Sequence, residues 1–189
     1  MFLKKNSVLT LTLLAALLAP IEAAWKWGGC PKPTLQSSFD LTQYVGTWYE
    51  IARDPNLPFE YGDCTQARYA IESNGHISVH NSLLNPNTNS IDSAYADAKC
   101  NGAHCHIKFF LTYSGDYRVV STDYTSYAVV FSCNDYIFAH HEYVWILGRT
   151  ESLDSTTLAA AQAIVTSQTD YDVSSFYYTV QGGSCTYLS

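Results

Sequence analysis

The 189-residue chain has few basic residues and no basic cluster. Lys and Arg total 10 against 17 Asp and Glu, which gives a formal net charge of −7 at pH 7. A surface that binds nucleic acid or an anionic membrane needs clustered positive charge to neutralise phosphate groups. The composition therefore excludes nucleic acid and an anionic membrane surface as partners.

Sequence signatures of common catalytic sites are absent as well. The chain has no G-x-S-x-G nucleophile motif and no H-E-x-x-H zinc motif. It has no N-x-Ser/Thr sequon either, so we expect no N-glycosylation. We therefore name no catalytic residue, and we predict neither a cofactor nor a bound metal.

The only long apolar run lies near the N-terminus. Lys4 and Lys5 precede the apolar residues 8–19, and small residues follow. This order is typical of a secretory signal peptide. The alternative is a membrane anchor, but the run has about a dozen residues whereas a membrane span needs about 20. We therefore predict a signal peptide at residues 1–23 and one soluble, exported domain at residues 24–189.

The predicted mature chain has six cysteines: Cys30, Cys64, Cys100, Cys105, Cys133 and Cys185. An even number in an exported protein predicts three disulfides and leaves no free thiolate. Spacing favours one pair, because Cys100 and Cys105 flank the turn signal Asn101-Gly102 and can face each other across a hairpin. The alternative is a zinc site, because His104 and His106 lie beside these cysteines.

The rest of the chain has the pattern of an all-β domain. Fifteen tyrosines and eight phenylalanines favour strands. Alternation predicts strands at 47–53, 65–72, 76–84, 90–99, 105–113, 117–122, 127–133 and 143–149. Turn signals such as Ser114-Gly115-Asp116 separate them, which is typical of an antiparallel sandwich or barrel. Helical spacing then predicts one α-helix at 153–168, capped by Asp154 or Ser155, and a short strand follows at 176–180.

Three separated segments carry a family pattern. Gly46-Thr47-Trp48 opens the first strand, Thr122-Asp123-Tyr124 lies between the sixth and seventh strands, and Arg149 ends the eighth. In this order they resemble the G-x-W motif, the T-D-Y motif and the arginine of the lipocalin family. The resemblance implies an eight-stranded antiparallel up-and-down β-barrel with one C-terminal α-helix.

The resemblance extends to the branch that contains apolipoprotein D, insect bilin-binding proteins and bacterial lipocalins. The segments that carry it are CPKP (30–33), FDLTQYVGTWYEIAR (39–53), FEYGDCTQARY (59–69), TDYTSYAVVFSC (122–133) and VWILGR (144–149). By position, this branch implies disulfides Cys30–Cys133 and Cys64–Cys185. The pair Cys100 and Cys105 does not belong to the branch pattern, so its pairing depends on the hairpin argument alone.

The resemblance also implies a barrel with one closed end and one open end. At the closed end Trp48 would lie under the guanidinium of Arg149 in a cation–π contact. Strand alternation supports this, because Arg149 shares a face with Trp145 and Leu147. We expect Gly46 to be required where a Cβ would crowd its neighbours. Structural roles are thus assigned to Gly46, Trp48, Thr122, Asp123, Tyr124 and Arg149.

Inward residues nearer the open end are the candidates for ligand binding. Asn81 shares a face with Ile77 and Val79, and a cavity tolerates such a polar group because it can orient a ligand. The alternative is that the polar tips touch water at the barrel mouth. The first candidates are Tyr69, Asn81, Phe109 and Trp145, and the second are Leu83, Leu111, Tyr113, Tyr117 and Tyr143. Each of them could instead belong to a plain barrel core.

The expected protein is a secreted, extracellular carrier that transports or sequesters a small hydrophobic ligand. Ligand classes that suit such a cavity are fatty acids, sterol-like lipids, retinoids and tetrapyrroles. One alternative is a lipocalin-fold enzyme that acts on a lipid. Another is a structural or signalling protein whose surface loops bind a cell-surface receptor or another protein.

One cluster of titratable residues remains, at His140-His141-Glu142. It precedes the eighth predicted strand, so we expect a solvated loop there. Adjacent histidines on an extended chain point to opposite sides, which disfavours a shared metal.

Overall fold

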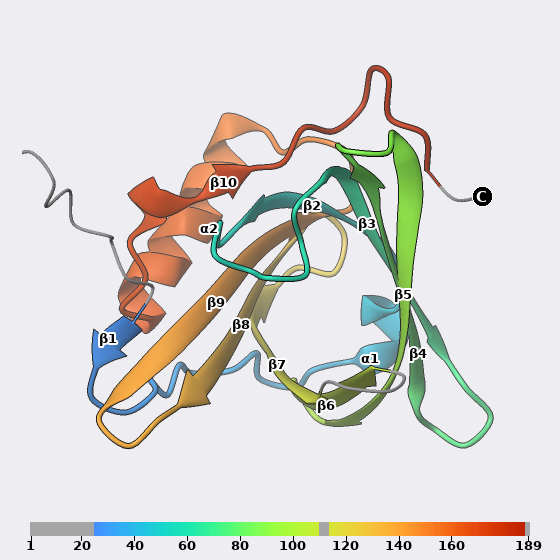
Figure 1. The fold of residues 1–189 in the computed structure, drawn as a ribbon. Coiled ribbons are helices and arrows are strands. Elements are labelled where there is room, and N and C mark those ends of the chain that lie inside the picture. Colours follow the sequence, from blue (N-terminus) through green and yellow to red (C-terminus); the bar gives the residue numbers. More distant parts are fainter. Residues whose placement is uncertain (1–24, 110–113, 188–189) are drawn as a thin grey trace, which may run out of the picture.

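The computed structural model describes residues 25–109 and 114–187, so the predicted signal peptide and two candidate residues, Leu111 and Tyr113, lie outside the described residues. The main feature is a closed antiparallel barrel (Figure 1). Its eight strands are β2 (Gly46–Arg53), β3 (Asp63–Ile71), β4 (Ile77–Asn85), β5 (Ser90–Asn101), β6 (His104–Phe109), β7 (Ser114–Thr122), β8 (Tyr127–Asp135) and β9 (Ala139–Gly148). Each strand pairs with the next, and β9 pairs with β2, which confirms the predicted up-and-down barrel.

Shorter elements surround this barrel. They are β1 (Trp25–Trp27), α1 (Leu41–Tyr44), α2 (Ser155–Gln168), a 3-10 turn η1 (Val173–Ser175) and β10 (Tyr177–Tyr178). β1 pairs with β9 and β10 pairs with β2, so both chain ends extend the sheet. The predicted C-terminal helix is confirmed, and the last strand is shorter than predicted. In the described part of the chain, no helix has the length and apolar character to cross a membrane.

Helix α2 lies against the outside of the barrel (Figure 1). Asp154 caps its first turn by accepting hydrogen bonds from two backbone amides, which would otherwise lack partners. Ala161 and Val165 are fully buried and pack with Phe131 and Ile146 in one apolar cluster. The strands beneath α2 therefore have no solvent-facing side.

Two local predictions about strand limits are wrong. β7 begins at Ser114, so Ser114-Gly115-Asp116 belongs to a strand and not to a turn. β9 begins at Ala139, which places His140 and Glu142 on a strand where the sequence predicted a solvated loop. Both side chains are almost completely buried, at 1% and 2% exposure. β9 is covered on both faces, so it lacks the alternation that identifies a half-buried strand.

Three disulfides join the described cysteines. Cys30 is bonded to Cys133 and Cys64 to Cys185, as the family resemblance implies. Cys100 is bonded to Cys105 across the β5–β6 hairpin, where the two residues are direct partners in the sheet. The zinc alternative does not fit, because Cys105 points inward on β6 whereas His104 and His106 are exposed.

Candidate ligand-binding site

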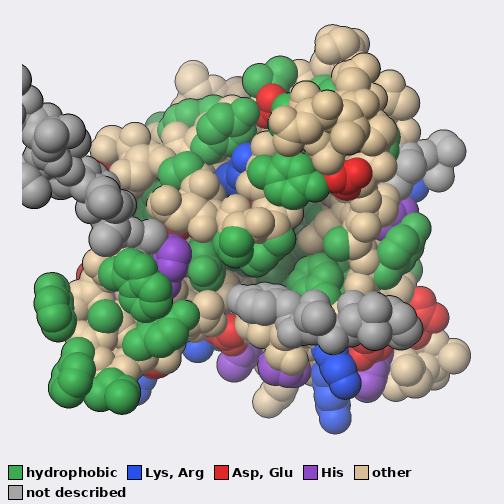
Figure 2. Space-filling model, in the orientation of Figure 1, with side chains coloured by type: hydrophobic (Ala, Val, Ile, Leu, Met, Phe, Trp, Pro, Cys, Tyr) green, Lys and Arg blue, Asp and Glu red, His purple; other side chains and the backbone are tan. Residues whose placement is uncertain are grey.

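The barrel encloses a cavity that opens toward the viewer in Figure 1, and Figure 2 shows the corresponding hollow bordered by hydrophobic side chains. Its empty volume, counted with the open mouth, is about 730 Å³. The residues that line it include Glu50, Phe59, Glu60, Tyr69, Val79, Asn81, Ile107, Phe109, Asp116, Tyr117, Val130, Tyr143, Trp145 and Leu147.

The structure brings most of the predicted ligand residues together on the cavity wall. Six of them line it: Tyr69, Asn81, Phe109, Tyr117, Tyr143 and Trp145. They come from five different strands, so only closure of the barrel makes them neighbours. Leu83 lies higher, in a second hollow at the mouth that shares Phe59, Glu60 and Asn81 with the cavity. The wall is therefore mainly aromatic and aliphatic, with a small number of polar tips.

Three tyrosine hydroxyls form the floor of the cavity. The Tyr117 hydroxyl lies 2.7 Å from that of Tyr44 and 3.2 Å from that of Tyr69. Burial raises the pKa of Tyr69 to about 12, and it also raises the pKa of Tyr44 and Tyr117. All three groups therefore stay uncharged at neutral pH and separate the cavity from the closed end.

The closed end is built on Trp48 and Arg149. Trp48 is fully buried, and its indole N–H donates to the carbonyl of Tyr44 at 2.8 Å. The guanidinium carbon of Arg149 lies 3.7 Å from the centre of the Trp48 ring. Arg149 also donates to the carbonyls of Thr47 and Tyr124, each at 2.8 Å. The expected contact is present, and neither residue lines the ligand cavity.

Gly46 is needed for a different reason from the one the sequence suggested. Its φ is +102°, a conformation that side chains rarely adopt, and it is exposed. A Cβ at this position would lie 3.4 Å from Arg149 Nη1, which is an ordinary contact distance. Backbone conformation, not crowding, thus explains the glycine.

The T-D-Y turn supports the same end of the barrel. The Asp123 carboxylate accepts hydrogen bonds from the backbone amides of Thr125, Ser126 and Tyr127. Burial opposes ionisation of Asp123, but the hydrogen bond from the Ser126 hydroxyl, together with those from the three amides, outweighs it and lowers the pKa of Asp123. The Tyr124 hydroxyl accepts from the Asp40 amide at 3.0 Å and so ties the turn to the segment before α1.

Sequence reasoning missed the loop between β2 and β3, which crosses the open end of the barrel (Figure 1). The Tyr61 hydroxyl anchors it by donating to Asp92 on β5 at 2.5 Å. Gly62 lets it approach β4, since a Cβ there would lie 2.2 Å from the Leu84 carbonyl oxygen. The anchored loop brings Glu60 into the cavity, where it accepts a 2.7 Å hydrogen bond from the indole N–H of Trp145.

A second carboxylate, Glu50 on β2, also lines the cavity and is 3% exposed. Its charge is paired, because Arg53 Nη1 lies 2.7 Å from its Oε1. Arg53 also donates to the Thr179 hydroxyl and stacks on Tyr177, so it is held outside the cavity. Burial, and then the nearby charge of Glu50, raise the pKa of Glu60 well above its ordinary value. Both glutamates lie in segments that carry the family resemblance, 39–53 and 59–69, but the sequence analysis assigned neither of them a role.

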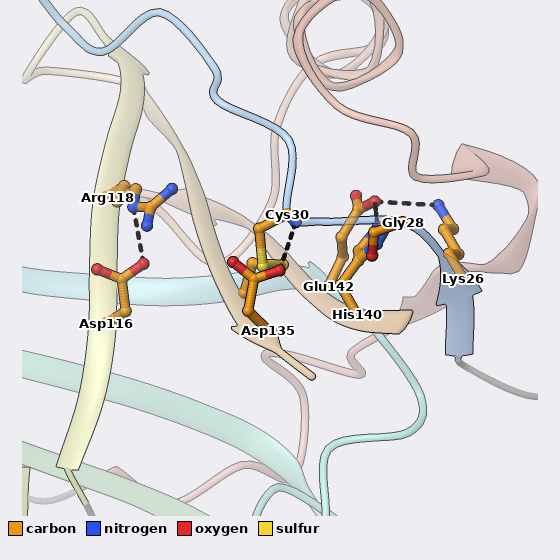
Figure 3. The surroundings of a disulfide bond; sticks show 9 residues. Lys26, Gly28, Cys30, Asp116, Arg118, Asp135, His140 and Glu142 are labelled. Atoms are coloured by element: carbon orange, nitrogen blue, oxygen red, sulfur yellow. Dashed lines mark hydrogen bonds and ion pairs between the residues drawn. A yellow bond between two sulfur atoms is a disulfide. The ribbon is translucent and has the colours of Figure 1, made fainter. Parts of the chain in front are cut away.

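The buried polar cluster on β9 does not line the cavity, and Figure 3 shows His140 and Glu142 beside Lys26 of β1. His140 Nε2 lies 3.0 Å from Glu142 Oε1, and the Lys26 ammonium lies 3.3 Å from the same oxygen. Glu142 and His140, with Asp170, form the one group of possible metal ligands found in the described ranges. Lys26 also donates to the carbonyl of Asp170. The Lys26 ammonium thus already contacts Glu142 and Asp170, where a metal ion would have to bind. We therefore assign the cluster to anchoring β1.

Comparison with known proteins agrees with this architecture. A family model described as a lipocalin-like domain matches residues 39–181. The chain is 40% identical over 166 residues to apolipoprotein D of Cavia porcellus, covering 85% of this chain and 87% of that protein. It is 38% identical over 173 residues to apolipoprotein D of Rattus norvegicus, covering 88% and 90%.

A solved structure shares the fold at lower sequence identity. The structure of H1 crustacyanin from the lobster Homarus americanus superposes with a TM-score of 0.75 at 22% identity, covering 86% of this chain and 93% of that chain. The family match and the curated relatives each span most of the chain, and the barrel, the helix and the closed end are those the motifs implied. The chain therefore belongs to the lipocalin family, and its sequence is similar to that of apolipoprotein D.

Proposed function

We propose that this protein is a secreted carrier that binds a small hydrophobic molecule in its barrel and transports or sequesters it. The observation that supports this most directly is the cavity with its aromatic wall. Burial of apolar ligand surface supplies roughly 25 cal/mol per Å². A few polar groups then fix the orientation of the ligand.

The proposal assigns the wall residues to ligand contact. Tyr69, Phe109, Tyr143 and Trp145 present large apolar surfaces to the cavity. Each aromatic side chain can bury a large area against a flat or elongated molecule. Asn81 supplies a side-chain oxygen that is buried and without a hydrogen-bond partner, which suits a ligand donor. Export through the predicted signal peptide completes the proposal, since three disulfides are typical of an oxidising compartment.

Tryptophan fluorescence tests the proposal, because Trp145 lies on the cavity wall. Titration with retinol or a long-chain alcohol is expected to quench the emission saturably at one ligand per protein, and the ligand should be recovered unchanged. Turnover of the ligand would contradict the carrier and favour an enzyme. Absence of saturable binding by any apolar probe would instead favour a protein whose surface loops bind its partner.

Two matched variants test whether the ligand binds in the cavity. Trp145→Ala is expected to weaken binding about tenfold or more, because it removes a large part of the wall. Trp27→Ala removes an indole that is 88% exposed on β1, and we expect it to leave the affinity unchanged. Circular dichroism should show both variants folded. Unfolding of Trp145→Ala would mean that this residue belongs to the structural core.

A further inference from the structure

The ionisable residues of the cavity suggest which polar end a ligand can carry. Among the described residues that line the cavity, the ionisable side chains other than tyrosine are Glu50, Glu60 and Asp116, and none is Lys or Arg. Asp116 is paired with Arg118 at 2.7 Å and with His104 at 2.5 Å. The hollow at the mouth adds Asp92 and again no cation.

The two arginines that pair with carboxylates of the lining are held by those pairs, Arg118 by Asp116 and Arg53 by Glu50. Arg53 is 4% exposed and lies 2.7 Å from Glu50, and its guanidinium stacks on Tyr177 at 4.3 Å. Moving it to a ligand would leave Glu50 buried without a counter-charge, which is strongly destabilising. Within the described ranges, the lining of the cavity therefore offers no free positive group to a ligand.

Glu60 is the polar group best placed to meet a ligand. Its Oε2 accepts the Trp145 hydrogen bond, so its carboxyl group is oriented beside an aromatic that we assign to the ligand. No ion pair of Glu60 occurs in the described part of the chain. Burial and the charge of Glu50 raise the pKa of Glu60 well above its ordinary value. Its carboxyl oxygens can accept a hydrogen bond from a ligand hydroxyl.

We propose that Glu60 and Trp145 form a polar subsite that selects apolar ligands with an uncharged polar end, such as a hydroxyl, over the same ligands ending in a carboxylate. This inference depends on the proposed carrier function. A ligand carboxylate in the cavity would lose its hydration without gaining a cation. It would also lie close to Glu50 and Glu60, which share its sign. A hydroxyl has neither penalty and can hydrogen-bond to the Glu60 carboxyl group.

The selectivity narrows the ligand classes expected from the family. Retinols, sterol-like alcohols and fatty alcohols satisfy the subsite. Free fatty acids, retinoic acid and tetrapyrroles with ionised side chains do not, unless their carboxylates remain outside in water.

Two pairs of ligands that differ only at the polar end test the proposal: retinol with retinoic acid, and oleyl alcohol with oleic acid. Dissociation constants are measured at neutral pH by quenching of tryptophan fluorescence in the wild-type protein. Each alcohol is expected to bind about tenfold or more tightly than its acid, since an unpaired buried polar group carries a penalty of that size. Equal affinities, or tighter binding of the acids, would overturn the proposal while leaving the carrier intact. Absence of binding by all four ligands would overturn the carrier function itself.

Glu60→Gln then assigns the selectivity to this residue. Glutamine keeps the size of the side chain and an oxygen that accepts from Trp145, but it removes the carboxyl group. The ratio of the two dissociation constants is expected to fall toward one, mainly because the acids bind more tightly. Glu72→Gln is the matched control, because Glu72 is exposed just beyond the far end of β3. An unchanged ratio in Glu60→Gln, or an equal change in Glu72→Gln, would refute the role of Glu60.

Discussion

Replacement of Arg149 by alanine is the sharpest test of how the closed end is held together. The guanidinium covers the Trp48 ring at 3.7 Å. Its N–H groups donate to the carbonyls of Thr47, Tyr124 and Gln43, each at 2.8 Å. Alanine removes these four interactions together and leaves the carbonyls of three separate segments without their common donor.

The expected loss follows from these contacts. Hydrogen bonds from a charged donor contribute about 1.5–3 kcal/mol each. Arg149 is half-buried, so water can replace part of each bond, and we take about 1 kcal/mol apiece. The cation–π contact adds roughly 0.5–2 kcal/mol. The free energy of unfolding should therefore fall by about 3–5 kcal/mol, which lowers Tm by roughly 6–20 °C in a domain of this size.

Urea unfolding followed by circular dichroism measures the change. Arg68→Ala is the matched control, because Arg68 on β3 is half-buried and its one side-chain hydrogen bond in the described structure goes to Gln66. We expect it to lose less than about 1 kcal/mol. Ligand affinity of folded Arg149→Ala should match that of the wild type, since Arg149 does not line the cavity. A loss below about 1 kcal/mol in Arg149→Ala would refute this account of the closed end.

Two further predictions concern pH and disulfides. Because the folded-state pKa of Asp123 is lowered, its stabilising contribution is complete above about pH 4 and is lost as the pH falls through the folded value. The difference in the free energy of unfolding between the wild type and Asp123→Asn, measured in urea, should therefore shrink on acidification. A difference that stays constant with pH would contradict this prediction. Cys64→Ser/Cys185→Ser opens a crosslink with a sequence separation of 121, against 5 for Cys100→Ser/Cys105→Ser. Loop entropy predicts a larger destabilisation of the first variant by roughly 2–3 kcal/mol in urea unfolding, and equal losses would contradict the entropic account.

The parts of the fold that could be predicted are those in which neighbouring residues form a recognisable pattern. The eight barrel strands alternate or are bounded by turn residues, and the helix changes the apolar period. Strands covered on both faces are harder, because alternation disappears there. At the start of β9, Ala139 to His141 pair with β1 along one edge, and His140 to Glu142 are buried in succession, so no alternation marks them as a strand.

The residues of the candidate site also include some that have a local sequence signal and some that have none. Inward parity on single strands, together with the family resemblance, predicted Tyr69, Phe109 and Trp145, which line the cavity. Glu60 could not be predicted, because it belongs to a loop without periodicity. It reaches Trp145, 85 residues away in sequence, only because Tyr61 and Gly62 fix the loop across the barrel mouth. Such a contact has no local signature in a single sequence.

Native mass spectrometry of the protein purified from its source can show directly whether the barrel holds a ligand. We expect a complex of one protein with one small apolar molecule that carries an uncharged polar end. Denaturation should release this molecule unchanged, and Trp145→Ala produced in the same way should retain much less of it. A protein that carries no small molecule and takes up none from a mixture of retinol, oleyl alcohol and their acids would contradict the proposed carrier function.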